Sequence, residues 1–149
     1  LVKVILPPAS IDEGAWSITA PLEVKADGES IKSFLSSMTN ATASETIDLS
    51  VETPEKRASL MEEYGLSESK RNAFNTPMVE LTLEGGKKLS MWFGTEHPMG
   101  DKYFVAAAED GKVNEKTVFL ISSYLRTNIY HDLTYFRDKA LFNFNRADV

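Results

Sequence analysis

The chain has 149 residues, of which 42% are hydrophobic and 26% are charged; its net charge is -6 and it contains no cysteine. This composition is that of a folded protein, and the length is that of one ordinary domain. The lack of cysteine excludes disulfides, thiolate metal ligands and cysteine nucleophiles. An acidic chain without a long basic stripe is not expected to bind nucleic acids or anionic lipid surfaces.

The first half of the chain predicts short strands and two helices. Apolar side chains alternate with other residues in three segments, which predicts strands over residues 1–6, 15–19 and 45–51. The first helix is predicted after Asp27, a residue suited to cap a helix, and is expected to end at Asn40. Its inner face repeats at helical spacing through Ile31, Phe34, Leu35 and Met38. The second helix is predicted to begin at Thr53-Pro54 and to end at Gly65.

The second half predicts a β-meander followed by two more helices. Strands joined by tight turns are expected over residues 78–83, 88–94 and 102–108. Another tight turn is expected at Asp110-Gly111. One helix is predicted to open at Asn114, and its inner face is expected to carry Val118, Ile121, Ser122 and Leu125. The last helix is predicted from His131 to about Leu141. This pattern predicts an α+β fold: a mainly antiparallel sheet with a β-meander and three to four helices packed on one face of it.

Two aromatic residues of the predicted meander are candidates for a binding surface. Trp92 lies on the opposite face of its strand from its two apolar neighbours. If helices cover one side of the sheet only, Trp92 and Phe104 are exposed on the other side, beside the small residues Ala106 and Ala108. An exposed aromatic patch of this kind suits a protein partner. The alternative is that both faces are covered and that these residues belong to the core.

The loop over residues 94–101 contains the residues best suited to chemistry. Glu96, His97 and Asp101 could converge on a metal ion or act as an acid and base pair; the alternative is an ordinary solvated hairpin loop. The other histidine, His131, lies in a different segment, and the sequence has no metal-ligand spacing, nucleophile elbow or phosphate-binding glycine motif. The sequence therefore predicts no catalytic residue set, no metal site and no cofactor.

Several short motifs occur in a recognisable order. They are Trp16–Pro21, Tyr64-Gly65-Leu66, Phe93-Gly94, Tyr103 and Phe136-Arg137-Asp138-Lys139. With these motifs, from about residue 15 to 144, the chain resembles the bacterial family DUF4340, a domain of unknown function. The stretch over residues 66–78 departs from the shorter turn of the family pattern.

The resemblance implies an extracytoplasmic protein for which no active site is known. Members of the family look like periplasmic portions of membrane-anchored proteins, and some stand beside ABC-transporter or gliding-motility components. No catalytic residue set is associated with the family, and its motif residues are expected to serve packing and turns. We therefore expect residues 1–149 to form a single domain of a longer protein, whose membrane anchor lies outside this sequence.

Three hypotheses for the function follow. The first is a non-enzymatic interaction or scaffold module of a bacterial envelope protein, accessory to an ABC transporter or a motility assembly, with other envelope proteins as partners. The second is an envelope domain that binds a glycan or a peptide through Trp92 and the 94–101 loop. The third is a hydrolase that uses His97 with Glu96 or Asp101. The first predicts a flat aromatic patch, the second a concave pocket beside Trp92, and the third a cleft that joins His97 to a carboxylate.

Overall fold

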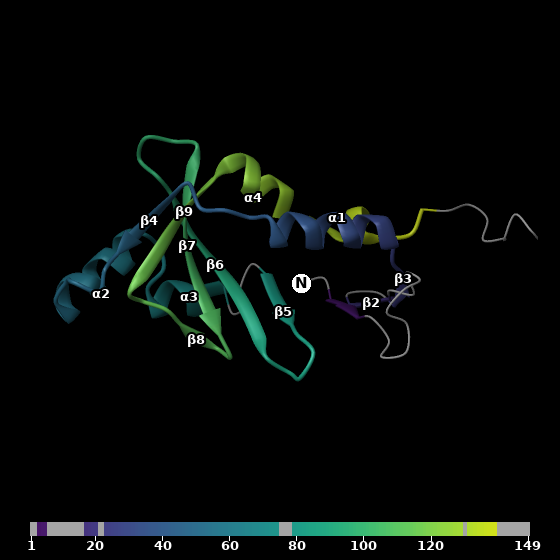
Figure 1. Cartoon of the computed structure of the whole chain (residues 1–149), viewed down its shortest axis with the longest axis horizontal. Helices are drawn as coiled ribbons and strands as arrows, with labels where there is room; N and C mark the ends of the chain where they lie inside the picture. The colour runs from purple at the N-terminus through teal and green to yellow at the C-terminus, as the bar shows by residue number, and fades with distance from the viewer. Residues whose placement is uncertain (1–2, 6–16, 21–22, 75–78, 130, 140–149) are drawn as a thin grey trace, which may run out of the picture. The chain divides into compact units, whose positions relative to one another are not determined.

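The computed structural model describes residues 3–5, 17–20, 23–74, 79–129 and 131–139 (Figure 1). The chain forms two compact units. The first is discontinuous and combines Leu1–Asn40 with His131–Val149, and the second is Ala41–Tyr130. The second unit is thus inserted, along the chain, between the two parts of the first.

The described residues of the first unit form a small antiparallel sheet and two helices. The sheet has the order β1-β2-β3 and consists of β1 (Lys3–Ile5), β2 (Ser17–Ala20) and β3 (Val24–Lys25). The helices are α1 (Gly28–Thr39) and α5 (Leu133–Phe136). A small core of buried side chains joins these elements: Ile18, Ala26, Ile31 and Phe136.

Helix α1 begins and ends where the sequence predicts. The Asp27 carboxylate accepts hydrogen bonds from the backbone N–H of Glu29 (3.1 Å) and from the hydroxyl of Ser30 (2.7 Å). It thereby satisfies a donor that the first turn of a helix leaves free. Ile31, on the predicted inner face, is 3% exposed, and the helix ends at Asn40.

The last helix is shorter than predicted. Helix α5 contains only Leu133–Phe136, and the next residue, Arg137, forms a β-bridge with Ala26. The N–H of Asp27 also donates to the carbonyl of Phe136 (2.8 Å). Through these contacts, Phe136 and Arg137 pair with the backbone just before α1 instead of continuing the helix. Arg137, Asp138 and Lys139 are not helical, and residues 140 and 141 of the predicted helix lie outside the described residues.

The second unit is built on a six-stranded antiparallel sheet. Its strand order is β4-β9-β7-β6-β5, and β8 pairs with β7. The strands are β4 (Glu45–Asp48), β5 (Val79–Thr82), β6 (Lys88–Glu96), β7 (Lys102–Glu109), β8 (Lys112–Val113) and β9 (Thr117–Ser122). The turn between β7 and β8 has φ of 47° at Asp110 and 80° at Gly111, as a type I′ hairpin turn requires. The antiparallel sheet and its meander confirm the predicted α+β fold class.

Three helices of this unit are described. They are α2 (Pro54–Glu63), α3 (Glu68–Phe74) and α4 (Ser123–Ile129). Helix α2 begins at the predicted cap: the Thr53 hydroxyl accepts a backbone N–H of the first turn (3.3 Å), and Pro54 is the first helical residue. Helix α3 lies within the stretch 66–78, for which the sequence predicts no element. Its Arg71 side chain forms an ion pair with Glu115 at 3.4 Å.

The prediction that a helix begins at Asn114 is wrong. Residues Thr117–Ser122 form the strand β9, which pairs with β4 on one side and with β7 on the other. The run Val118–Ile121 is apolar throughout, so its periodicity fits a buried helix and a buried strand equally well. The strand forms because partner strands stand on both sides of it. Asn114 instead stabilises a turn, since its Oδ1 accepts the N–H of Lys116 (3.0 Å).

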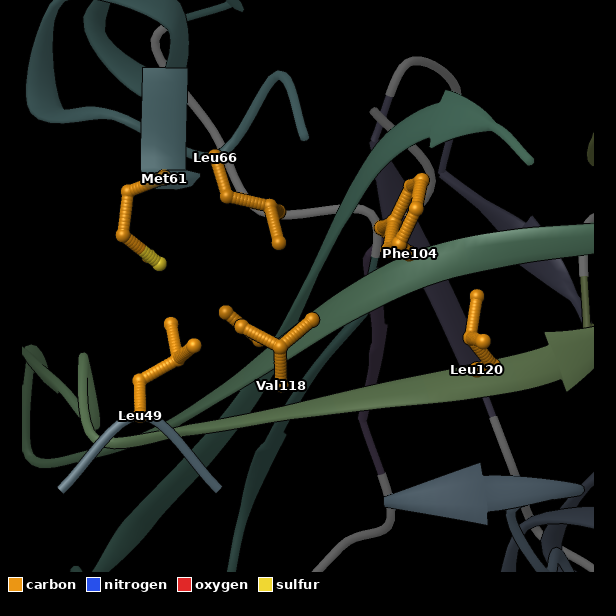
Figure 2. Close-up of a cluster of buried hydrophobic side chains, with 7 residues drawn as sticks. Leu49, Met61, Leu66, Phe104, Val118 and Leu120 are labelled. Atoms are coloured by element: carbon orange, nitrogen blue, oxygen red, sulfur yellow. The ribbon is translucent and has the colours of Figure 1, made fainter. Parts of the chain in front are cut away.

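The main core lies on one face of this sheet. Figure 2 shows the side chains of Met61 and Leu66 pointing toward those of Leu49 and Val118, which come from the sheet side. The buried members of this core are Leu49, Met61, Leu66, Phe104, Ala106, Val118 and Leu120. Helix α2 and the segment after it therefore cover this face.

The opposite face of the same sheet is also covered in part. Val105 and Ile121 project from that face, because side chains alternate along a strand, and they are only 2% and 4% exposed. The guanidinium of Arg126, on α4, lies 4.7 Å from the ring centre of Tyr103, which projects from the same face. The prediction that helices cover one face only is therefore wrong.

Candidate functional site

The predicted aromatic patch is part of the main core. Phe104 is 5% exposed, and its ring stacks on that of Tyr64 with centroids 4.2 Å apart. Burial raises the pKa of the Tyr64 hydroxyl above its ordinary value. Trp92 is half-buried against the same core, directly opposite the fully buried Ala106. The expected exposure of Phe104 is wrong, because α2 and Leu66 cover this face and Phe104 belongs to the core, as the alternative predicts. Trp92 packs against the same core and remains partly exposed.

The connection between β6 and β7 is shorter than the predicted loop over residues 94–101, because β6 continues to Glu96 and only residues 97–101 join the strands. Three hydrogen bonds close this loop. The N–H of His97 donates to the carbonyl of Lys102 (2.8 Å), and the carbonyl of His97 accepts the N–H of Gly100 (2.7 Å). The Nδ1 atom of His97 accepts the N–H of Met99 (3.2 Å). One histidine therefore holds the loop through its backbone and its ring.

The three polar residues singled out in this loop do not form a catalytic or metal-binding cluster. His97 is half-buried with its ring centre 5.6 Å from that of Phe104, whereas Glu96 and Asp101 are exposed. Among the described residues, no hydrogen bond or ion pair joins His97 to the carboxylate of Glu96 or Asp101. Within the same residues, no three His, Asp or Glu side chains lie close enough together to hold a metal ion.

A residue distant in sequence lies near this loop. The Lys102 ammonium donates a hydrogen bond to the Glu45 carboxylate and forms an ion pair with it. This hydrogen bond is the main cause that lowers the pKa of Glu45, and the charge of Lys102 acts in the same direction. Sequence analysis missed Glu45 because only the order β4-β9-β7 brings its strand to this end of the sheet.

Two large apolar side chains are exposed at this end of the sheet. Met99, in the loop, is 88% exposed, and Tyr124, in the first turn of α4, is 78% exposed. The carbonyl of Asp101 accepts the N–H of Ser123 (2.9 Å), which joins the end of the loop to the start of the helix (Figure 1). The sequence does contain a signal for Met99: a methionine between Pro98 and Gly100 lies in a turn and has no strand to pack on.

A hollow of about 540 Å³ lies at the β7–β8 hairpin. It is lined by Ala107, Glu109, Asp110, Lys112, Val113 and Asn114. None of the residues predicted to bind a ligand lines it. The concave pocket expected beside Trp92 is thus not this hollow.

The family of the chain follows from its sequence as a whole. A model of the family described as "domain of unknown function (DUF4340)" matches residues 16–149. The chain belongs to this family. The match extends over residues of both compact units of this DUF4340 protein. Comparisons with curated proteins and with solved structures found no match. In the part of the chain that the structure describes, no helix has both the length and the apolar character needed to cross a membrane.

Two DUF4340 motif positions, Gly65 and Gly94, meet in the second unit. The carbonyl of Tyr64 accepts the N–H of Thr95 (2.9 Å), so the turn after α2 lies directly against β6. A Cβ on Gly94 would lie 2.0 Å from the carbonyl oxygen of Tyr64, and a Cβ on Gly65 would lie 2.9 Å from Cγ2 of Thr95. Both glycines therefore serve packing, as the resemblance implies. Another motif residue, Trp16, lies outside the described residues.

Proposed function

We propose that this DUF4340 domain is a non-enzymatic protein-interaction module of a bacterial envelope protein, accessory to an ABC transporter or a motility assembly. The single observation that carries the proposal is the exposure of Met99 and Tyr124 on two segments that a hydrogen bond holds together. Family membership supports the envelope setting, because members of the family resemble extracytoplasmic parts of membrane-anchored proteins.

The chemistry of these two side chains suits a protein partner. Tyrosine and methionine are both enriched in protein interfaces, tyrosine for its amphipathic ring and methionine for its adaptable shape. Burying such a side chain stabilises a complex by about 1.5–3 kcal/mol before the costs of association. The three hydrogen bonds that close the loop around His97 reduce the conformational entropy that binding would otherwise cost.

The two other hypotheses lack a supporting contact. Binding of a glycan or a peptide by Trp92 needs an exposed indole face, and this side chain packs against the main core. Hydrolysis by His97 needs a carboxylate that orients the ring, and Nδ1 of His97 accepts a backbone N–H instead. Glu96 and Asp101 remain candidates for binding because both are exposed, at the end of β6 and in the loop that carries Met99.

A pull-down from detergent-solubilised envelopes of the native host, analysed by mass spectrometry, tests the proposal. The wild-type chain is compared with the double variant M99A/Y124A and with the control V51A, which removes an exposed apolar side chain (81% exposed) at another place. All three should unfold with free energies within about 0.5 kcal/mol of one another, because these are surface substitutions.

The expected result is specific recovery of transporter or motility proteins by the wild type and by V51A, with loss of that recovery in M99A/Y124A. Equal recovery by all three chains would contradict the assignment of the surface. Recovery of nothing above background by the wild type would overturn the proposed function.

A further inference from the structure

We propose that the partner docks a basic segment, with lysine or arginine next to large apolar side chains, onto a surface formed by Glu96, Met99, Asp101 and Tyr124. We name these four residues the tip surface. The inference rests on the proposed function and adds to it the chemical class of the partner.

The acidic side chains of the tip surface lack the lysine partners that three glutamates on the strands of this sheet have. Three glutamates on its strands pair with a lysine: Glu45 with Lys102, Glu80 with Lys88 and Glu109 with Lys87. Glu96, at the end of β6, has no hydrogen-bond or ion-pair partner for its carboxylate among the described residues, and neither has Asp101. Two carboxylates that form no ion pair with a described residue therefore lie at the end of the sheet where Met99 and Tyr124 are exposed.

This arrangement complements a cation that carries apolar neighbours. The two carboxylates attract lysine or arginine, and the face of the Tyr124 ring can hold the same cation by a cation–π contact. Met99 offers an adaptable apolar surface to the residues beside that cation. The two carboxylates repel anionic lipid headgroups and acidic peptides, which are therefore disfavoured as partners.

The backbone of the loop supports a fixed position for Met99 and Asp101 relative to α4. Asp101 adopts a positive φ of 59°, which is uncommon for a residue with a side chain and costs free energy. The carbonyl of the same residue accepts the N–H of Ser123 (2.9 Å). The strained residue is thus the one that joins the loop to α4 and brings Met99 and Tyr124 to one end of the sheet.

A selection of random peptides displayed on phage tests the inference with the 149-residue chain as bait. The library is first depleted on the M99A/Y124A chain and then selected on the wild type. The peptides that remain should be rich in lysine or arginine beside leucine, methionine or an aromatic residue. A synthetic copy of the most enriched peptide then serves as the probe in fluorescence anisotropy.

The double variant E96Q/D101N keeps the shape of the tip surface and removes its charge. Asparagine is a suitable replacement at position 101 because it tolerates a positive φ. The variant should bind the peptide about 4- to 25-fold more weakly, from about 2- to 5-fold for each carboxylate, and its binding should depend less on salt. The control E55Q/E84Q removes the same charge from two exposed positions elsewhere and should bind like the wild type.

Several results would overturn the inference. One is enrichment of acidic or uncharged peptides that still need Met99 and Tyr124, which would leave the proposed function standing. Another is unchanged affinity in E96Q/D101N, or failure to enrich any peptide that distinguishes the two baits. Binding of the wild type, but not of M99A/Y124A, to vesicles of phosphatidylglycerol and phosphatidylethanolamine would assign the tip surface to a membrane instead.

Discussion

Replacing Gly94 with alanine is expected to destabilise the second unit strongly, although the substitution adds a single methyl group. The new Cβ would lie 2.0 Å from the carbonyl oxygen of Tyr64 and 3.0 Å from Cγ of Leu66. The shortest ordinary contacts between carbon and oxygen are about 3.3 Å, so the carbonyl oxygen of Tyr64 and the new Cβ must move apart by roughly 1.3 Å. The obstacle is a backbone atom, which no side-chain rotation can remove.

The magnitude follows from two contributions. Forcing an additional carbon into a packed region costs about 1–3 kcal/mol. The separation also breaks the hydrogen bond from the N–H of Thr95 to the carbonyl of Tyr64, now 2.9 Å long, which costs about 1 kcal/mol more. The free energy of unfolding should therefore fall by about 2–4 kcal/mol, a large part of the roughly 5–15 kcal/mol that stabilises an ordinary protein.

Urea unfolding followed by circular dichroism measures this change. Gly86→Ala is the matched control, because Gly86 has a positive φ of 86° but nothing within 4 Å of the position that a Cβ would take there. That variant should lose only about 1 kcal/mol, from backbone strain alone. A Gly94→Ala variant that loses no more free energy than Gly86→Ala would refute the claim that close packing, rather than backbone conformation, requires glycine at position 94.

Three further predictions concern the main core and the first turns of two helices. Phe104→Ala should lower the free energy of unfolding by about 3–5 kcal/mol in urea titrations, because a buried ring that stacks on Tyr64 leaves a cavity; a loss below about 1 kcal/mol would mean that the ring is exposed. Thr53→Ala should cost about 1 kcal/mol in the same assay, because α2 loses its cap; an unchanged stability would contradict the cap. The pKa of Asp27, measured by NMR titration, should lie below its ordinary value of 3.8 because the Ser30 hydroxyl donates to its carboxylate, and Ser30→Ala should raise it. Since folding lowers the pKa of Asp27, the ionised carboxylate stabilises the folded chain above about pH 4, and this stabilisation is lost as the pH falls through the pKa of the folded state. A pKa of Asp27 that does not change in Ser30→Ala would refute the role of the Ser30 hydroxyl.

Features that depend on a few neighbouring residues were predictable from the sequence. The cap at Asp27, the helix start at Thr53-Pro54 and the turn at Asp110-Gly111 all occur where expected. In each, the chemistry is contained within about four residues, so no knowledge of the fold is needed. The turn within the predicted 94–101 loop was predictable for the same reason, whereas the continuation of β6 to Glu96 was not.

Features that depend on distant partners were not predictable. The run Val118–Ile121 became a strand because β4 and β7 stand on either side of it. Phe104 became a core residue because the ring of Tyr64, at the end of α2, stacks on it. The ion pair of Glu45 with Lys102 likewise joins strands that are far apart along the chain.

The alternation of side chains along β6 determined by itself that Trp92 and Met91 lie on opposite faces, because this alternation is a property of the local backbone. Only the tertiary structure decided that α2 covers the face of Trp92, since burial depends on which distant segment supplies the covering side chains. In the same way, the sequence determined that Met99 lies in a turn. The bond between Asp101 and Ser123, which exists only in the folded chain, brought Tyr124 to the same end of the sheet.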